Sequence, residues 1–290
     1  MNEYVIVTDS CCDLTQEIAD KYNLVIVPLT LNFSGTSYKN YLDGREIQPK
    51  ELYSKLSEGE LPTTSAVNIA EFEEIFEPIA SEGKDILYIG FSSGLSGTYS
   101  TGKTYLSMLS EKYPDRKLYS VDSLCASLGQ GLLVYLAAQL KEEGKNIDEV
   151  KAYVEENVPH LCHWFTVNDL FHLQRGGRVS AAVAIVGSVL GIKPVLHVDN
   201  EGHLTSVSKA RGRKASINAL FDKMVQTGID IKNQTVFISH GDCEEDANLL
   251  ADRIKSELGV KEVIINYVGP VIGAHSGCGT LALFFLGTQR

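Results

Sequence analysis

The amino-acid sequence predicts two α/β domains, the first with a largely parallel sheet covered by helices on both faces and the second with a mixed sheet and helices. Three observations lead to this prediction. Short apolar runs alternate with segments of helical period over residues 1–160. After Pro159 the pattern changes, and two β-like runs flank a tight turn. The length of 290 residues suits two domains. We therefore expect domains over residues 1–160 and 161–290.

The elements of the first half follow from apolar runs and helix-start signals. The apolar runs predict four strands, over residues 4–7, 25–31, 85–91 and 117–121. Asp13 with Gln16, and Asn146 with Glu149, have the spacing of capping boxes and predict two helix starts. Pro49 is typical of a first helical turn.

The elements of the second half include an antiparallel hairpin around the turn at 199–202. A strand is expected over 164–167, followed by a short helix that ends at Gly176–Gly177. Residues 180–192 are uncharged and apolar on every side, which predicts a helix that is buried or lines an apolar cavity. The last four elements alternate between helix and strand, over residues 213–225, 235–239, 247–258 and 262–268.

Composition and charge narrow the class of protein. With 44% hydrophobic and 22% charged residues, the chain is typical of globular proteins, and no apolar stretch approaches the roughly 18 residues of a membrane span. The first ten residues lack the features of an export signal, and the six scattered cysteines suit a reducing compartment, so we expect a cytoplasmic protein. The net charge of −11, without a dense basic run, argues against a nucleic-acid partner.

A metal site is an alternative use of the histidines and cysteines near the predicted boundary. His160, Cys162 and His163 lie close together in the sequence, with His172 nearby. Their spacing fits no zinc motif, and a strand begins at about residue 164, so we predict no metal. The adjacent Cys11 and Cys12 are interpreted as small buried side chains.

Residues 97–104 match the phosphate-binding pattern G-x-x-x-x-G-K-[ST]. In such loops the glycine-rich segment follows its strand directly, and the helix begins near the Lys. Here the strand is expected to end near Phe91, and apolar residues at helical spacing predict a helix over 98–110, with Lys103 inside it. A nucleotide-binding loop therefore stays only an alternative.

The turn at residues 92–98 carries four hydroxyl side chains and two glycines. Hydroxyls and the free N–H groups of a helix start can together hold an anionic group. Similar polar turns occur at 8–10, 62–65, 122–123 and 273–280. Because ligands of open α/β sheets bind at the carboxyl ends of the strands, these turns are expected to converge on one site.

A serine hydrolase is the main alternative for this set of side chains. Ser96 would be the nucleophile, His275 the base, and Asp9 or Asp122 the group that orients the base. The local sequence G-L-S-G lacks the G-x-S-x-G elbow that exposes a nucleophile after a strand. The residues alone leave this alternative open.

Nine segments, in order and across essentially the whole chain, resemble the DegV family: TDSCCDLTQEIA, VPLTLNF, LPTTSAV, FSSGLSGTYST, VDSLCASLGQG, LFHLQRGGRVS, GIKPVLHV, KARGRKA and GPVIGAHSGCGT. The resemblance implies a two-domain α/β protein that binds a long-chain fatty acid, such as palmitate, in an apolar tunnel between the domains. It implies a lipid-binding protein without chemistry or cofactor of its own. Its expected partner is a separate ATP-dependent fatty-acid kinase, which would phosphorylate the bound acid.

The same resemblance assigns roles to individual residues. Thr64 and Ser96 match the family positions that hold the carboxylate, and three residues are expected near the head group, namely His275, Arg211 and Ser93. Arg178 of the RGGR segment is expected to contact the kinase partner or its phosphate. Residues 180–192 and 281–287 are candidate tunnel walls. Cys11–Cys12, Ala66 and Cys278 depart from the family pattern, which leaves the preferred chain length and unsaturation open.

Overall fold

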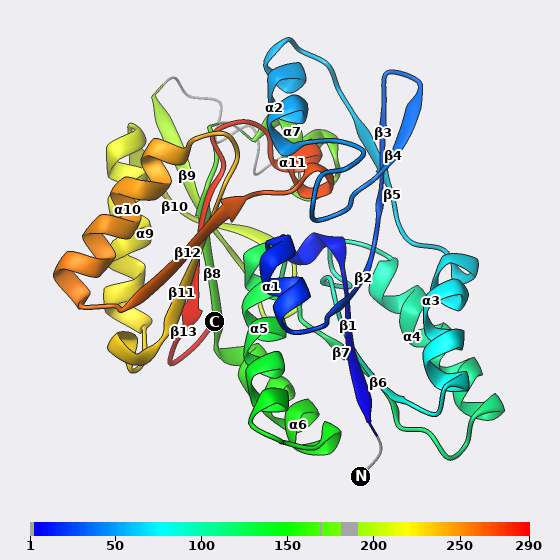
Figure 1. Cartoon of the computed structure of the whole chain (residues 1–290). Coiled ribbons are helices and arrows are strands. Elements are labelled where there is room, and N and C mark those ends of the chain that lie inside the picture. Colours follow the sequence, from blue (N-terminus) through cyan, green and yellow to red (C-terminus); the bar gives the residue numbers. More distant parts are fainter. Residues whose placement is uncertain (1–2, 169, 181–190) are drawn as a thin grey trace.

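The computed structural model describes residues 3–168, 170–180 and 191–290, and Figure 1 shows the arrangement of their helices and strands. The apolar helix expected within 180–192, a candidate tunnel wall, falls almost wholly on residues 181–190, which lie outside the described residues.

The predicted parallel sheet is present and has four strands, in the order β2-β1-β6-β7. Its strands are β1 (Tyr4–Asp9), β2 (Val25–Val27), β6 (Asp85–Gly90) and β7 (Leu118–Asp122). Every pairing in this sheet is parallel, so the carboxyl ends of the strands share one edge. The run at 25–31 does not form one strand as expected, because the chain leaves the sheet at Val27, before Pro28, and enters a different sheet.

Helices cover both faces of this sheet. On one face, α3 (Ile69–Ser81) and α4 (Thr98–Lys112) bury an aromatic cluster that includes Phe72, Phe76 and Tyr88. On the other face lie α1 (Gln16–Lys21), α5 (Leu128–Glu142) and α6 (Ile147–Asn157). The predicted arrangement of the first half, with helices on both faces, is therefore confirmed.

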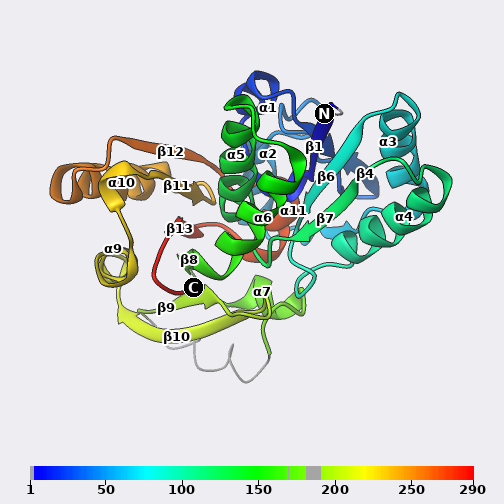
Figure 2. The ribbon, with the colours of Figure 1, turned by 90° about the horizontal axis from the view of Figure 1, so that it is seen from below.

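The second large sheet has six strands, in the order β10-β9-β8-β13-β11-β12. They are β8 (Leu161–Thr166), β9 (Ile192–Val198), β10 (Leu204–Arg211), β11 (Thr235–His240), β12 (Glu262–Tyr267) and β13 (Leu281–Leu286). Only β11 and β12 pair in parallel, which confirms the predicted mixed sheet, and β9 with β10 forms the predicted hairpin. Helices α9 (Arg213–Thr227) and α10 (Glu244–Leu258) cover the face away from α5 (Figure 2).

Helix α5 lies between the two large sheets, as Figure 2 shows. Its residues from Leu128 to Tyr135 are all buried, and they share a core with strands of both sheets. This position explains why the first three turns of α5 carry no charge, since a helix surrounded on all sides has no solvent face to occupy with polar residues.

A third sheet was not predicted. It consists of β3 (Thr30–Phe33), β4 (Thr36–Lys39) and β5 (Thr63–Ser65), in the order β4-β3-β5. Figure 1 shows it near α2 (Pro49–Ser57), α7 (Phe171–Arg175) and α11 (Pro270–Ser276). The PTTS segment, expected as a turn, supplies β5, which pairs with β3 so that Thr64 lies opposite Leu31.

The helix-start predictions have mixed outcomes. Asn146 and Glu149 form the expected capping box, and Pro49 opens α2. The box at Asp13 and Gln16 is wrong, because Thr15 caps α1 and accepts a hydrogen bond from Ile18 N. Three short 3-10 helices complete the described elements: η1 (Ser10–Cys12), η2 (Val158–His160) and η3 (Ile231–Asn233).

Candidate functional site

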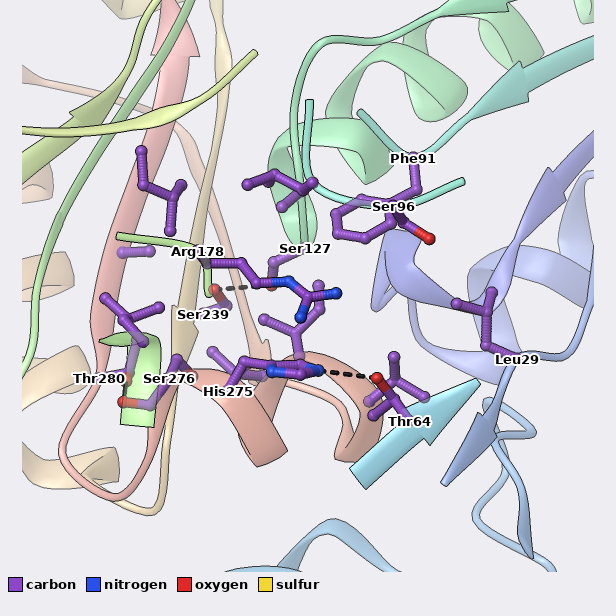
Figure 3. Close-up of a pocket in the computed structure, with 18 of the residues that line it drawn as sticks. Leu29, Thr64, Phe91, Ser96, Ser127, Arg178, Ser239, His275, Ser276 and Thr280 are labelled. Atoms are coloured by element: carbon purple, nitrogen blue, oxygen red, sulfur yellow. Dashed lines mark hydrogen bonds between the residues drawn. The ribbon is translucent and has the colours of Figure 1, made fainter. Parts of the chain in front are cut away.

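A pocket lies at the carboxyl edge of the parallel sheet, where the turns after β2, β6 and β7 meet the six-stranded sheet, β5 and α11 (Figure 3). The space between its atoms is about 880 Å³, a volume that includes space open to solvent. Most of its lining is apolar and includes Leu29, Phe91, Leu95, Phe165, Leu173, Leu204, Val268, Val271 and Ile272. Of the polar turns expected to converge, those at 62–65, 92–98 and 273–280 supply lining residues, whereas residues 8–10 and 122–123 do not line the pocket.

Thr64 and His275 form the best-defined polar pair of the pocket. Thr64 Oγ1 and His275 Nε2 are hydrogen-bonded at 2.7 Å, across the gap between β5 and the last turn of α11 (Figure 3). Burial, followed by the nearby charges of Arg178 and Arg175, lowers the pKa of His275 to about 3. The imidazole is therefore neutral near pH 7 and carries a single N–H.

Gly176 makes the space that His275 occupies. A Cβ atom at position 176 would overlap the imidazole at Nδ1, so only glycine fits there without moving the ring. His275 Nδ1 is buried and has no hydrogen-bond partner among the described residues. The first glycine of the RGGR segment thus has a packing role against the site.

Ser96 lines the same pocket from the turn between β6 and α4. Its Oγ lies 3.0 Å from Thr98 Oγ1 and accepts a hydrogen bond from Thr98 N at 3.2 Å. Figure 3 shows Ser96 and Thr64 on the same side of the pocket. Ser93, in contrast, is exposed and does not belong to the lining, and its N–H donates to Asp122. The structure brings Ser96, and not Ser93, to the pocket.

The two arginines named from the sequence lie in different places. Arg178 lines the pocket and is half-buried, and Figure 3 shows its guanidinium near His275. It donates to Gly176 O, and no carboxylate of the described residues pairs with it. Arg211 ends β10, is exposed, and is not part of the lining. Arg175 and Arg178 both lie near His275, but Arg175 donates to Pro62 O and Ala274 O, and Arg178 is the one that lines the pocket.

The geometry of a serine hydrolase is not assembled. His275 Nε2 bonds Thr64 instead of Ser96. The Asp9 carboxylate accepts from Phe91 N, Cys11 N and Tyr88 Oη, and the Asp122 carboxylate accepts from Ser93 N and Leu124 N. Neither acid contacts His275, so no described group orients that ring as a catalytic base.

The match to a phosphate-binding loop is also not supported. Helix α4 begins at Thr98, directly after Gly97, so most of the matching segment is helical. From Thr101 onward its backbone N–H groups bond along the helix instead of wrapping a phosphate. Lys103 is exposed on the second turn of α4, and the helix predicted over 98–110 is confirmed.

The residues named for a possible metal site are used otherwise. His160 Nδ1 lies 3.0 Å from Gly287 O, Cys162 Sγ donates to Gln289 O, and His163 Nδ1 lies 3.2 Å from Cys125 Sγ. Within the described part of the chain, no three His, Cys, Asp or Glu residues gather as metal ligands would. None of the helices in the described part of the chain is both long enough and apolar enough to cross a bilayer.

A buried polar network at the pocket was missed by sequence reasoning. Ser127 Oγ donates to Asp13 Oδ2 at 2.6 Å and lies 3.0 Å from Ser239 Oγ, and both serines line the pocket (Figure 3). Burial raises the pKa of Asp13 to about 7. The network links the turn after β1, the start of α5 and β11. Its only sequence signal was the polar character of the turns that carry Asp13 and Ser127.

Comparisons with known proteins agree with this fold. A DegV domain-containing protein of Clostridium perfringens is 47% identical over 290 residues, which cover 100% of this chain and 99% of the relative. A DegV family protein from Thermus thermophilus, described as fatty-acid binding, has 30% identity and a TM-score of 0.89, with 99% of this chain and 100% of that chain covered. The fatty-acid-binding protein DegV of Bacillus subtilis has 30% identity and a TM-score of 0.85 at the same coverage.

The family assignment rests on the whole chain. The model of the DegV family, whose description reads uncharacterised protein, matches residues 3–288. The resemblance of the nine sequence segments is thus confirmed, and so is the α/β fold class. The chain belongs to the DegV family.

Proposed function

We propose that this protein binds a long-chain fatty acid, such as palmitate, with the acyl chain along the apolar lining and the carboxylate held by Thr64 and Ser96. The observation that carries the proposal is the meeting of both hydroxyls with a neutral imidazole and an unpaired arginine at one apolar pocket. The solved relatives named above are described as fatty-acid-binding proteins, which supports the same ligand class.

The chemistry of the pocket matches a carboxylate. Burying a carboxylate costs several kcal/mol unless donors and a nearby positive charge replace its water. When His275 donates its Nε2 proton to Thr64 Oγ1, the Thr64 hydroxyl proton is left for the ligand. Ser96 supplies a second hydroxyl, and Arg178 supplies a positive charge that no described carboxylate neutralises. We assign the remaining expected head-group residues, Arg211 and Ser93, no direct contact with the carboxylate.

The expected partner of this activity is a separate ATP-dependent fatty-acid kinase in the cytoplasm, with the present chain as the acyl-carrying, non-catalytic subunit. In this arrangement the bound acid enters lipid metabolism after phosphorylation by the partner. Arg178 is then placed to meet the transferred phosphate, since it lines the pocket beside His275.

The test is the affinity of delipidated protein for palmitic acid in four forms: wild type, Thr64→Ala, Ser96→Ala and the control Thr63→Ala. Removing a hydroxyl donor from a desolvated carboxylate costs about 1 to 3 kcal/mol, so Thr64→Ala and Ser96→Ala weaken binding roughly fivefold to 150-fold. Thr63 is the exposed neighbour on β5 and is absent from the lining, so Thr63→Ala binds as the wild type does. Unchanged affinity in both Thr64→Ala and Ser96→Ala would contradict the assigned head-group position.

A further inference from the structure

Strand β8 contributes a further polar side chain to the pocket, His163, which lies apart from the turn that carries Ser96. His163 lines the pocket and is only 5% exposed. Its ring packs on two aromatic rings, with centroid distances of 4.6 Å to Phe284 and 5.3 Å to Phe165. Near it the lining continues with the apolar side chain of Ala282, because Ala282 pairs with Phe165 across β13 and β8. An imidazole in this wall is therefore set among apolar groups.

His163 has one ring nitrogen satisfied by the protein. Its Nδ1 lies 3.2 Å from Cys125 Sγ, and no hydrogen bond joins its Nε2 to another described residue. Nε2 is not among the fully buried polar atoms that lack a partner, so it keeps access to open space in the pocket. Burial, together with the charge of Arg290, holds the pKa of His163 well below 6.5, and burial raises the pKa of Cys125 to about 11. Both side chains are therefore neutral. Cys125 forms a hydrogen bond with Nδ1 of the ring, and Nε2 remains free to bond a ligand.

Three hydroxyls of the lining already have partners in the protein. Ser127 and Ser239 bond each other, and Ser127 also bonds Asp13. Thr280 Oγ1 donates to the backbone at Ser276 and Gly277. A desolvated nitrogen without a partner costs free energy when an apolar chain fills the space around it. A polar atom on the ligand that bonds His163 Nε2 would remove this cost.

We propose that His163 is a specificity-determining residue that favours fatty acids with a hydroxyl group on the acyl chain. The proposal rests on the proposed function, because it places the acyl chain along this lining. A hydroxyl is the one simple group that suits both tautomers of the ring. If Cys125 donates to Nδ1, then Nε2–H donates to the hydroxyl oxygen, and if Nδ1 carries the proton, Nε2 accepts from the hydroxyl.

The experiment measures the affinity of delipidated wild-type protein for palmitic acid and for monohydroxypalmitic acids with the hydroxyl near the carboxyl group, in mid-chain and near the methyl end. The isomer whose hydroxyl reaches His163 is expected to bind about threefold to tenfold more tightly than palmitic acid. The other isomers bind more weakly than palmitic acid, because their hydroxyl is buried without a partner.

Two variants test whether His163 causes the preference for a hydroxylated fatty acid. His163→Leu loses the preference and keeps or gains affinity for palmitic acid, since the unpaired nitrogen is gone. Ser276→Ala is the matched control, because Ser276 also lines the pocket and has a buried hydroxyl without a described partner. It retains the preference. Circular dichroism and thermal melting confirm that both variants are folded.

Two results would overturn the inference while palmitic acid still binds: no hydroxylated isomer exceeds palmitic acid in the wild type, or a folded His163→Leu protein keeps the preference. The first result needs no variant. If neither palmitic acid nor any hydroxylated acid binds, the proposed function fails and this inference falls with it.

Discussion

At the scale of single residues, the site depends on a histidine that is kept neutral. His275 bonds Thr64, has its pKa lowered to about 3, and fits only because position 176 is glycine. A protonated imidazole would donate from both nitrogens, yet Nδ1 faces no acceptor among the described residues. Neutral His275 is therefore part of the folded state and not only of the binding site.

This gives a pH prediction for His275. The folded-state pKa of about 3 lies below the ordinary value of 6.5, so between these pH values the unfolded chain binds the proton and the folded chain does not. The free energy of unfolding therefore falls as the pH drops below 6.5, by at most about 1.4 kcal/mol per pH unit from this group. His275→Gln removes this contribution, as urea unfolding at pH 6.5 and 4.5 would measure.

The comparison with the variant is needed because two acids act in the opposite sense. Burial raises the pKa of Asp9 to about 6 and of Asp13 to about 7, so both stabilise the fold when protonated and lose that contribution as the pH rises. Their effect is common to wild type and His275→Gln and cancels in the difference. Equal losses of stability in the two proteins over this range would show that His275 is not held neutral by the fold.

At the scale of elements, the turn of the β9–β10 hairpin packs on the turn after β6. Ser92 Oγ donates to Gly202 O at 2.8 Å, and a Cβ at Gly94 would lie 2.8 Å from the same oxygen. Gly202 itself has a φ of +81°. Leu204, next to this contact, and Leu95 both line the pocket. The contact thus joins the two large sheets at the pocket wall.

Gly94→Ala tests this contact between turns. The added methyl group has no room beside the backbone of Gly202, so we expect a loss of about 1 to 3 kcal/mol in the free energy of unfolding. Ser93→Ala is the control on the same turn, because Ser93 is exposed, and its effect stays within about 0.5 kcal/mol. Urea unfolding gives both values. Equal stability of Gly94→Ala and wild type would show that the turns do not pack as described.

Elements with clear apolar runs could be predicted from the sequence. Elements whose formation depends on contacts between distant residues could not. The four parallel strands and the β9–β10 hairpin were predictable from their periodicity. Strand β5 was not, because three polar residues show no apolar alternation and form a strand only by pairing with β3. Asp13 has the sequence of a cap, but its φ of 51° and its bond to Ser127 place it in a buried network.

The site residues likewise fall into those that the sequence identified and those that only the tertiary structure reveals. The polar turns and the family resemblance brought out Thr64, Ser96 and His275, and all three line one pocket. The position of Arg178 could not be read from the sequence, since it depends on how the chain turns after α7 and packs against His275. The Cys125–His163 pair joins residues 38 positions apart, and only the tertiary fold brings them together.

At the scale of the whole molecule, the pocket is built from both halves of the chain. Turns at the carboxyl edge of the parallel sheet supply Ser96 and Ser127, while α11 and the six-stranded sheet supply His275 and His163. Helix α5 is buried between the two sheets and fixes their spacing. The expected boundary near residue 160 stays a prediction. A ligand that contacts both halves is expected to raise the melting temperature of the intact chain.

The most direct measurement of the central claim is mass spectrometry of the organic extract from purified, denatured protein. The proposed function predicts close to one long-chain fatty acid per chain, and rebinding of palmitic acid after the lipid is removed. A purified, folded protein that releases no fatty acid and takes up none after delipidation would contradict it.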